Sequence, residues 1–191
     1  MGRELDDSTI EDVSNEESKN SLEAKKARAD KIIAMHVAGA VTVGFTPIPF
    51  SDAPILIANQ IALVNNVANV YERAELKELM SVLLKQIGVG LIVSRLAVSC
   101  TAYLTAQLLK IFPILGSIAG GLVNGSVAGA VTYGYGVAAN TFCYLKCRDA
   151  ASKGWESNMT DDDIRNFTHT FNQAFDGYPA ELARDTANEL E

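Results

Sequence analysis

The sequence has few of the residues that carry most enzyme chemistry. Its 191 residues include two histidines, three cysteines and one tryptophan, and aromatic residues make up only 7% of the chain. An odd cysteine count does not describe a disulfide framework, and a net charge of −7 argues against a nucleic-acid partner. Collagen-like and wholly disordered classes are excluded by composition. One domain of ordinary size remains, whose 14 glycines favour close backbone packing over an aromatic-filled core.

No residue cluster in the sequence has the spacing of a catalytic or metal site. Cys143 and Cys147 are one helical turn apart, but no nearby histidine or second cysteine pair completes four ligands; we expect small buried side chains on one helix face. Residues 39–46 have the glycine spacing of a phosphate-binding loop, but Phe45 stands where lysine is required. His36 lies among apolar residues and is expected to be packed with its polar groups satisfied. We therefore predict a protein that is not an enzyme and that holds no metal and no cofactor.

Charge and polarity divide the chain into three parts. Residues 1–20 are polar without any period and are predicted to be a disordered acidic tail. Residues 21–150 are predicted to form a hydrophobic helical domain, and residues 151–191 an acidic C-terminal helical segment. The net charge is −4 over residues 1–30, +3 over 31–150 and −6 over 151–191. Acidic flanks around an apolar, mildly basic middle favour a membrane-proximal unit with solvated ends, or a hydrophobic unit kept soluble by its tails.

The apolar residues recur at helical spacing, and no segment alternates as a strand does. The predicted fold class is therefore all-α, a helical bundle. A first helix is expected over residues 21–44, because Pro47 and Pro49 forbid its continuation. A C-terminal helix is expected over residues 160–189, beginning with a capping box formed by Thr160 and Asp163.

The segment 52–73 is predicted as a bundle helix with Asp52 as a candidate N-cap. On a helical wheel its charged and amide side chains share one arc, and its apolar side chains, including Ile57 and Ile61, fill the opposite side. Gln60 falls in the middle of that apolar side. A buried amide needs partners, so we expect Gln60 to hydrogen-bond a neighbouring helix or the proline turn, with a ligand contact as the alternative.

Residues 88–112 and 115–146 are predicted to form a Gly-rich hydrophobic helical hairpin that breaks at Pro113. No charged residue occurs in the 35 positions 111–145, which exceeds the ~20 residues that a bilayer span requires. Basic residues flank this run on both sides, which suits a hairpin that enters or lies against the bilayer with both termini cytoplasmic. Glycines at four-residue spacing would let two helices approach closely; they are Gly116, Gly120, Gly121, Gly125 and Gly129.

The segment from His36 to about Asp149, roughly 60% of the chain, resembles a family catalogued as domain of unknown function 697. The matching features are TPIPFSDA at 46–53, Gln60, Tyr71, FPILG at 112–116 and TYGYG at 132–136. The resemblance implies a helical, often membrane-associated module, frequently attached behind a small GTPase domain. Asp52 and Gln60 both fall on family motif positions. The resemblance implies that Asp52 caps a helix and that Gln60 forms a buried hydrogen bond. About 35 residues precede this segment, too few for a GTPase domain, so a GTPase partner is expected to be a separate protein.

We therefore predict a non-enzymatic, membrane-associated helical protein that serves as an accessory or regulatory module linked to GTPases. Membrane lipid and a separate GTPase are the expected partners. Two alternatives stay open. One is a soluble helical adaptor or oligomerisation module that docks on a separately encoded GTPase or on a second copy of the chain. The other is a helical protein that inserts into membranes and permeabilises them.

Overall fold

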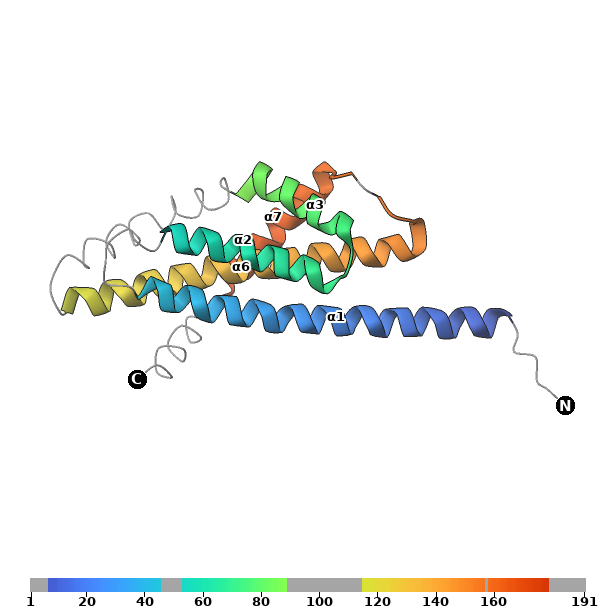
Figure 1. Ribbon diagram of the computed structural model, residues 1–191, viewed down its shortest axis with the longest axis horizontal. Helices are drawn as coiled ribbons and strands as arrows, with labels where there is room; N and C mark the ends of the chain where they lie inside the picture. The colour runs from blue at the N-terminus through green and yellow to red at the C-terminus, as the bar shows by residue number, and fades with distance from the viewer. Residues whose placement is uncertain (1–6, 46–52, 89–114, 157, 179–191) are drawn as a thin grey trace.

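The computed structural model describes residues 7–45, 53–88, 115–156 and 158–178, and every regular element in these ranges is a helix. The predicted all-α class is confirmed. In chain order the elements are α1 (Asp7–Gly44), α2 (Ala53–Val70), α3 (Ala74–Leu83), the π-helical turn η1 (Leu84–Gly88), α6 (Leu115–Lys153) and α7 (Asp161–Asp176) (Figure 1).

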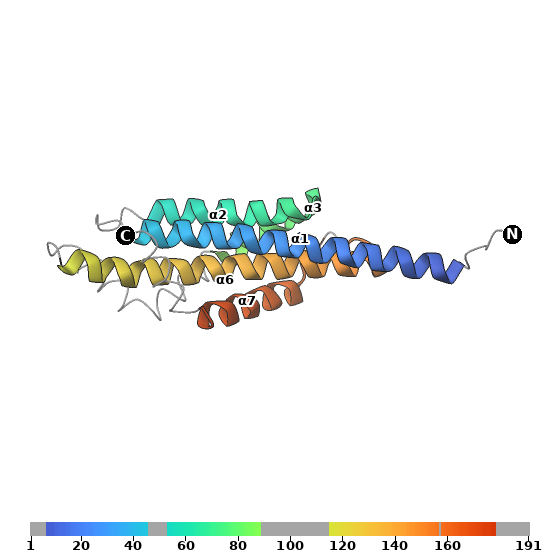
Figure 2. The same cartoon turned by 90° about the horizontal axis from the view of Figure 1, so that it is seen from below.

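The helix α6 is the central element of the bundle. It runs antiparallel to α1, the other long helix, and it also contacts α2 and α7. Figure 2 shows α1 and α7 on opposite sides of α6, with α2 beside α1. The core therefore lies on several faces of one helix, so α6 needs small or apolar residues around most of its circumference.

The core is built from apolar side chains of α1, α2, α3, α6 and α7, and Leu84 of η1 packs against it. Tyr135 on α6 packs edge-on against Phe171 of α7, with ring centroids 5.0 Å apart, and Phe167 of α7 lies on the same ring. Both phenylalanines belong to an apolar stripe at helical spacing, and both are buried. The largest fully buried side chains elsewhere are Val41, Leu63, Val64, Val67, Tyr71, Leu76, Met80 and Leu83.

Glycines of α6 bring its backbone close to its neighbours. A Cβ atom at Gly136 would lie 2.7 Å from Cγ1 of Ile33, and one at Gly129 would lie 2.8 Å from Cγ2 of Val41. Contacts this short are sterically forbidden in a close-packed interior. In the described part of the chain, the uncharged run of α6 therefore packs directly against α1.

None of the described helices combines the length and apolarity needed to cross a membrane. The transmembrane helix expected within 115–146 is thus not supported. The physical reason is composition, because this run of α6 contains many Gly, Ser, Thr and Asn residues that lower its mean hydropathy. Of the other expected hairpin limb, 88–112, all but Gly88 lies outside the described residues.

The helix α1 begins at Asp7, whereas the sequence alone predicts a disordered tail over residues 1–20. The helix also starts well before Ser21, where the apolar pattern begins. Extending an existing helix fixes one residue per added hydrogen bond, without repeating the costly nucleation step. Once residues 22–44 are packed, a polar segment without proline or glycine can continue the helix although it has no apolar face.

The helix α2 does not bury the whole of its expected apolar side. Ile57 and Ile61 are 51% and 48% exposed, whereas the wheel placed them inside. Asn59 and Asn66, expected on the outer arc, instead hydrogen-bond His36 of α1. These amide contacts rotate α2 relative to the wheel, because a hydrogen-bonded seam with α1 takes up part of its inner face.

Candidate functional site

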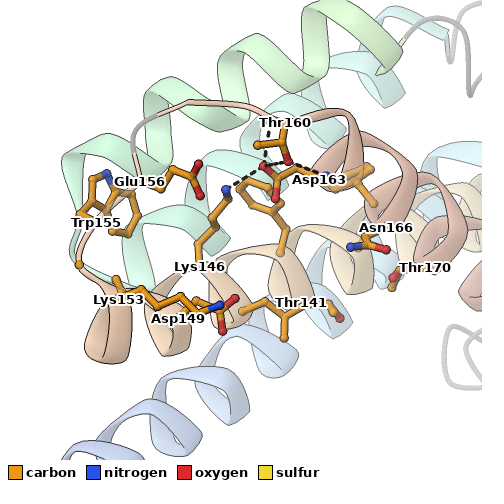
Figure 3. A pocket seen from close by; sticks show the side chains of 16 residues that line it. Thr141, Lys146, Asp149, Lys153, Trp155, Glu156, Thr160, Asp163, Asn166 and Thr170 are labelled. Atoms are coloured by element: carbon orange, nitrogen blue, oxygen red, sulfur yellow. Dashed lines mark hydrogen bonds and ion pairs between the residues drawn. The ribbon is translucent and has the colours of Figure 1, made fainter.

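A cavity of about 450 Å³ lies between α6, α7 and the connection that joins them. This volume is within the range of small-molecule sites, which is roughly 300–1,000 Å³. Figure 3 shows α6 on one side of the cavity, and the connection and α7 on the other. We take this cavity as the candidate functional site.

The two helices present regularly spaced side chains to the cavity. On α6 these residues recur every three or four positions from Ala138 to Lys153, and on α7 from Asp163 to Thr170. This spacing marks one face of a helix. The same faces are in direct contact further along, where Phe171 lies against Gly134. The cavity therefore forms where the two helices separate towards the connection.

The capping box at the start of α7 fixes one wall of the cavity. The Asp163 amide N–H donates to Thr160 Oγ1 at 3.1 Å, and the Thr160 amide N–H donates to Asp163 Oδ2 at 2.9 Å. This predicted capping box is confirmed. It satisfies two backbone donors that would otherwise lack partners at the helix N-terminus.

Lys146 connects α6 to this capping box. Its Nζ donates to Asp163 Oδ2 at 2.7 Å, and the two side chains are only 13% and 17% exposed. The ammonium also lies 5.8 Å from the centroid of the Phe142 ring. Burial opposes ionisation of Asp163, but hydrogen bonds from Lys146 and Thr160 outweigh it, so the pKa of this carboxyl lies below its usual value. The Asp163 carboxyl therefore stays ionised at neutral pH.

Five polar side chains around the cavity make no hydrogen bond or ion pair with another described residue. They are Thr141 and Lys153 on α6, Glu156 in the connection, and Asn166 and Thr170 on α7. Charged groups gather at the end near Trp155, and the two threonines and the asparagine lie at the opposite end (Figure 3). The floor is apolar, with Phe142 and Phe167 buried beneath it. The cavity therefore offers a ligand hydrogen-bond donors, hydrogen-bond acceptors and one unpaired charge of each sign.

A second polar cluster joins three helices inside the bundle. Tyr71, at the end of α2, donates to Oδ1 of Asn140 at 2.5 Å. Asn140 lies on α6 and donates through Nδ2 to Asp30 of α1 at 2.7 Å. Burial, with the nearby Cys143 thiol as the next cause, raises the pKa of Tyr71 far above its usual range, so its hydroxyl stays protonated and can donate. Because its polar groups are paired with one another inside the bundle, we assign this cluster a structural role.

Apart from Thr160 and Asp163 of the capping box, the described residues that were singled out in the sequence do not line the cavity. Gln60 is buried in α2, and Gly125 and Gly129 lie where α6 meets the end of α1. Gly116, Gly120 and Gly121 belong to the first turns of α6. Pro47, Pro49, Asp52 and Pro113 lie outside the described residues.

Two further expectations concern candidate ligands. His36 is hydrogen-bonded through both ring nitrogens, with Nδ1 2.7 Å from Asn59 Oδ1 and Nε2 3.1 Å from Asn66 Nδ2. Its predicted role as a satisfied packed residue is confirmed. Cys143 is buried and Cys147 half-buried. No group of three or more His, Cys, Asp or Glu residues suited to a metal ion occurs in the described part of the chain.

The cavity itself was missed by reasoning from sequence. The only signal was the matched helical spacing of polar residues on α6 and α7. Such spacing is also typical of two helix faces that pack together or face solvent, so it does not predict that the helices separate there.

The fold and the cavity define an all-helical module with a polar-rimmed hollow between its central and last helices. The family described as Domain of unknown function (DUF697) matches residues 9–160, and the chain belongs to this family. The match begins before His36, where the resembling segment starts, and so includes most of α1. No curated protein and no solved structure matches the chain.

Proposed function

We propose that this protein is a non-enzymatic helical module that associates with the cytoplasmic surface of a membrane and acts as an accessory to a separate GTPase. The observation that carries the membrane part is the outer face of α2. Ile57 and Ile61 lie one turn apart on this face and are each about half exposed. No charged residue occurs anywhere in α2.

An uncharged helix face with two half-exposed isoleucines one turn apart is suited to the boundary between lipid headgroups and acyl chains. Burying a fully exposed isoleucine side chain contributes about 1.5–3 kcal/mol. Ile57 and Ile61 each have roughly half of that still to gain. Their burial would therefore contribute to surface binding without any helix that crosses the bilayer.

Vesicle co-sedimentation tests this membrane association. The full chain is mixed with phosphatidylcholine vesicles and with vesicles that also contain phosphatidylglycerol. We expect the protein to pellet with lipid, and we expect the double variant Ile57→Gln/Ile61→Gln to lose most of this binding. Met35→Gln is the matched control, because Met35 is an exposed apolar residue on α1. Equal binding by the α2 variant and the native chain would contradict the proposal.

The GTPase partner is inferred from the family resemblance rather than from a contact in the structure. It is tested by affinity capture of the tagged full chain in the presence of GDP or a non-hydrolysable GTP analogue. Enrichment of a GTP-binding protein that depends on the added nucleotide supports the proposal. Capture that is identical with both nucleotides and without nucleotide argues against it.

The non-enzymatic part is supported by the chemistry of the cavity. The described residues that line it include no histidine or cysteine. Lys146 is held by Asp163, and this carboxylate also accepts two hydrogen bonds from Thr160. These groups hold the start of α7 in place and are not paired as a nucleophile and a base.

A further inference from the structure

We propose that the cavity between α6 and α7 binds a small zwitterion of the amino-acid type whose side chain carries a hydrogen-bonding group. This inference goes beyond the proposed function, which uses α2 and does not depend on the cavity. It rests on the distribution of the lining residues, because unpaired charged side chains lie at one end of the cavity and neutral polar side chains lie at the other.

The end of the cavity near Trp155 fits a head that carries both charges. Lys153 and Glu156 lie there, are exposed, and form no ion pair with another described residue. A ligand carboxylate can be held by Lys153, and a ligand ammonium by Glu156. Asp149, at the same end, is already engaged by Arg148 at 3.1 Å.

The opposite end fits a side chain with an amide or hydroxyl group. Thr141, Asn166 and Thr170 lie at this end (Figure 3), and their side chains form no hydrogen bond with another described residue. Between the two ends, the floor offers the apolar surfaces of Phe142 and Phe167. A short methylene chain can lie on this floor while polar groups at both ends of the ligand find partners.

The balance of charge favours a zwitterion over a singly charged ligand. Lys146 and Asp163 neutralise each other within the cavity wall. The free charges that remain, on Lys153 and Glu156, are one of each sign. A ligand with only one charge would pair with Lys153 or with Glu156 but not with both, so it would form one ion pair where a zwitterion forms two.

The single tryptophan of the chain allows binding to be measured at the cavity itself. Trp155 lines the cavity, and the guanidinium of Arg73 lies 5.2 Å from its ring. The probes are glutamine, 4-aminobutanamide, which lacks the carboxylate, and 4-carbamoylbutanoate, which lacks the ammonium. We expect glutamine to produce a saturable change in Trp155 fluorescence and in the indole N–H signal at millimolar concentration. Each of the two analogues should bind at least about fivefold more weakly than glutamine, as expected for the loss of one ion pair near a surface.

Two variants and two controls locate the site. Glu156→Gln and Lys153→Gln remove the free charges, and each is expected to weaken glutamine binding about fivefold. Both side chains are exposed and unpaired among the described residues, so the fold should not depend on them. Glu78→Gln and Lys77→Gln make the same changes on the exposed face of α3 and should bind as the native chain does.

Three outcomes would overturn the proposal. The first is no saturable signal with glutamine, and the second is equal binding of glutamine and either analogue. The third is unchanged affinity in both cavity variants. Because vesicle binding is measured separately through α2, any of these results would leave the proposed membrane function standing.

Discussion

The hydroxyl oxygen of Tyr178 lies over Gly129 of α6, 2.6 Å from the position that a Cβ atom at this glycine would take. The Tyr178 ring also packs against Tyr133, with centroids 5.6 Å apart. The chain at the end of α7 thus packs against α6 through a contact that is possible only because Gly129 has no side chain. Val41 of α1 approaches the same glycine from another direction.

Replacing Gly129 with alanine is expected to destabilise the protein. The added methyl group would overlap both Tyr178 and Val41, and overpacking of this kind costs about 1–3 kcal/mol. Urea unfolding followed by circular dichroism measures the change in the free energy of unfolding.

Gly39→Ala is the matched control for this substitution. Gly39 lies in α1, and nothing stands within 4 Å of its Cβ position. Alanine is the better helix former, so this variant is expected to gain about 0.5–1 kcal/mol. Equal effects at the two positions would show that packing at Gly129 does not decide the outcome.

Replacing Tyr71 with phenylalanine is expected to cost about 1–3 kcal/mol, because it leaves the buried Oδ1 of Asn140 without its hydroxyl donor. Tyr144→Phe provides the comparison. Its hydroxyl donates to Glu23 at an exposed position, where water replaces the lost donor, so the cost should stay within about 0.5 kcal/mol. Thermal and urea unfolding of both variants would check the difference, and a larger loss at Tyr144 would contradict this assignment.

Acid is expected to weaken the attachment of α7 through Asp163. The pKa of this carboxyl is lower in the folded chain than its usual value of 3.8. Its contribution to stability is therefore complete above that usual value, and it is lost as the pH falls through the lower folded pKa. The slope of unfolding free energy against pH, measured between neutral pH and about 2, should become shallower in Asp163→Asn. Asp162→Asn changes an exposed side chain in the same turn, and its pH profile should match that of the native chain.

Local sequence signals predicted the helices better than the way in which they meet. The capping box of Thr160 and Asp163 depends only on neighbours three residues apart, and it forms as expected. The exposure of Ile57 depends on which neighbour α2 meets, and the wheel had no means of including the amide contacts to His36. Hydropathy alone assigns an apolar residue to the inside, but it does not account for a polar seam that competes for the same face.

The candidate site was harder to foresee, because it arises from the angle between two helices. Lys146 and Asp163 are 17 residues apart, and neither carries a local signal that it will meet the other. Glu156 lies in a connection without regular structure, where no period applies. The buried hydrogen bond between Tyr71 and Asn140 joins residues that are 69 positions apart, and helical spacing does not predict it either.

The first turns of α1 extend past the ends of the neighbouring helices (Figure 1). Among residues 20–44 of this helix, contact with the core begins at Leu22, and the first fully buried residue is Ala29. Unwinding from Asp7 inward therefore breaks backbone hydrogen bonds without disturbing the packed interior, and such local opening requires little free energy. Deuterium should enter the amides of residues 7–20 well before those around Ile33 and Val41, as a gradient along one continuous helix.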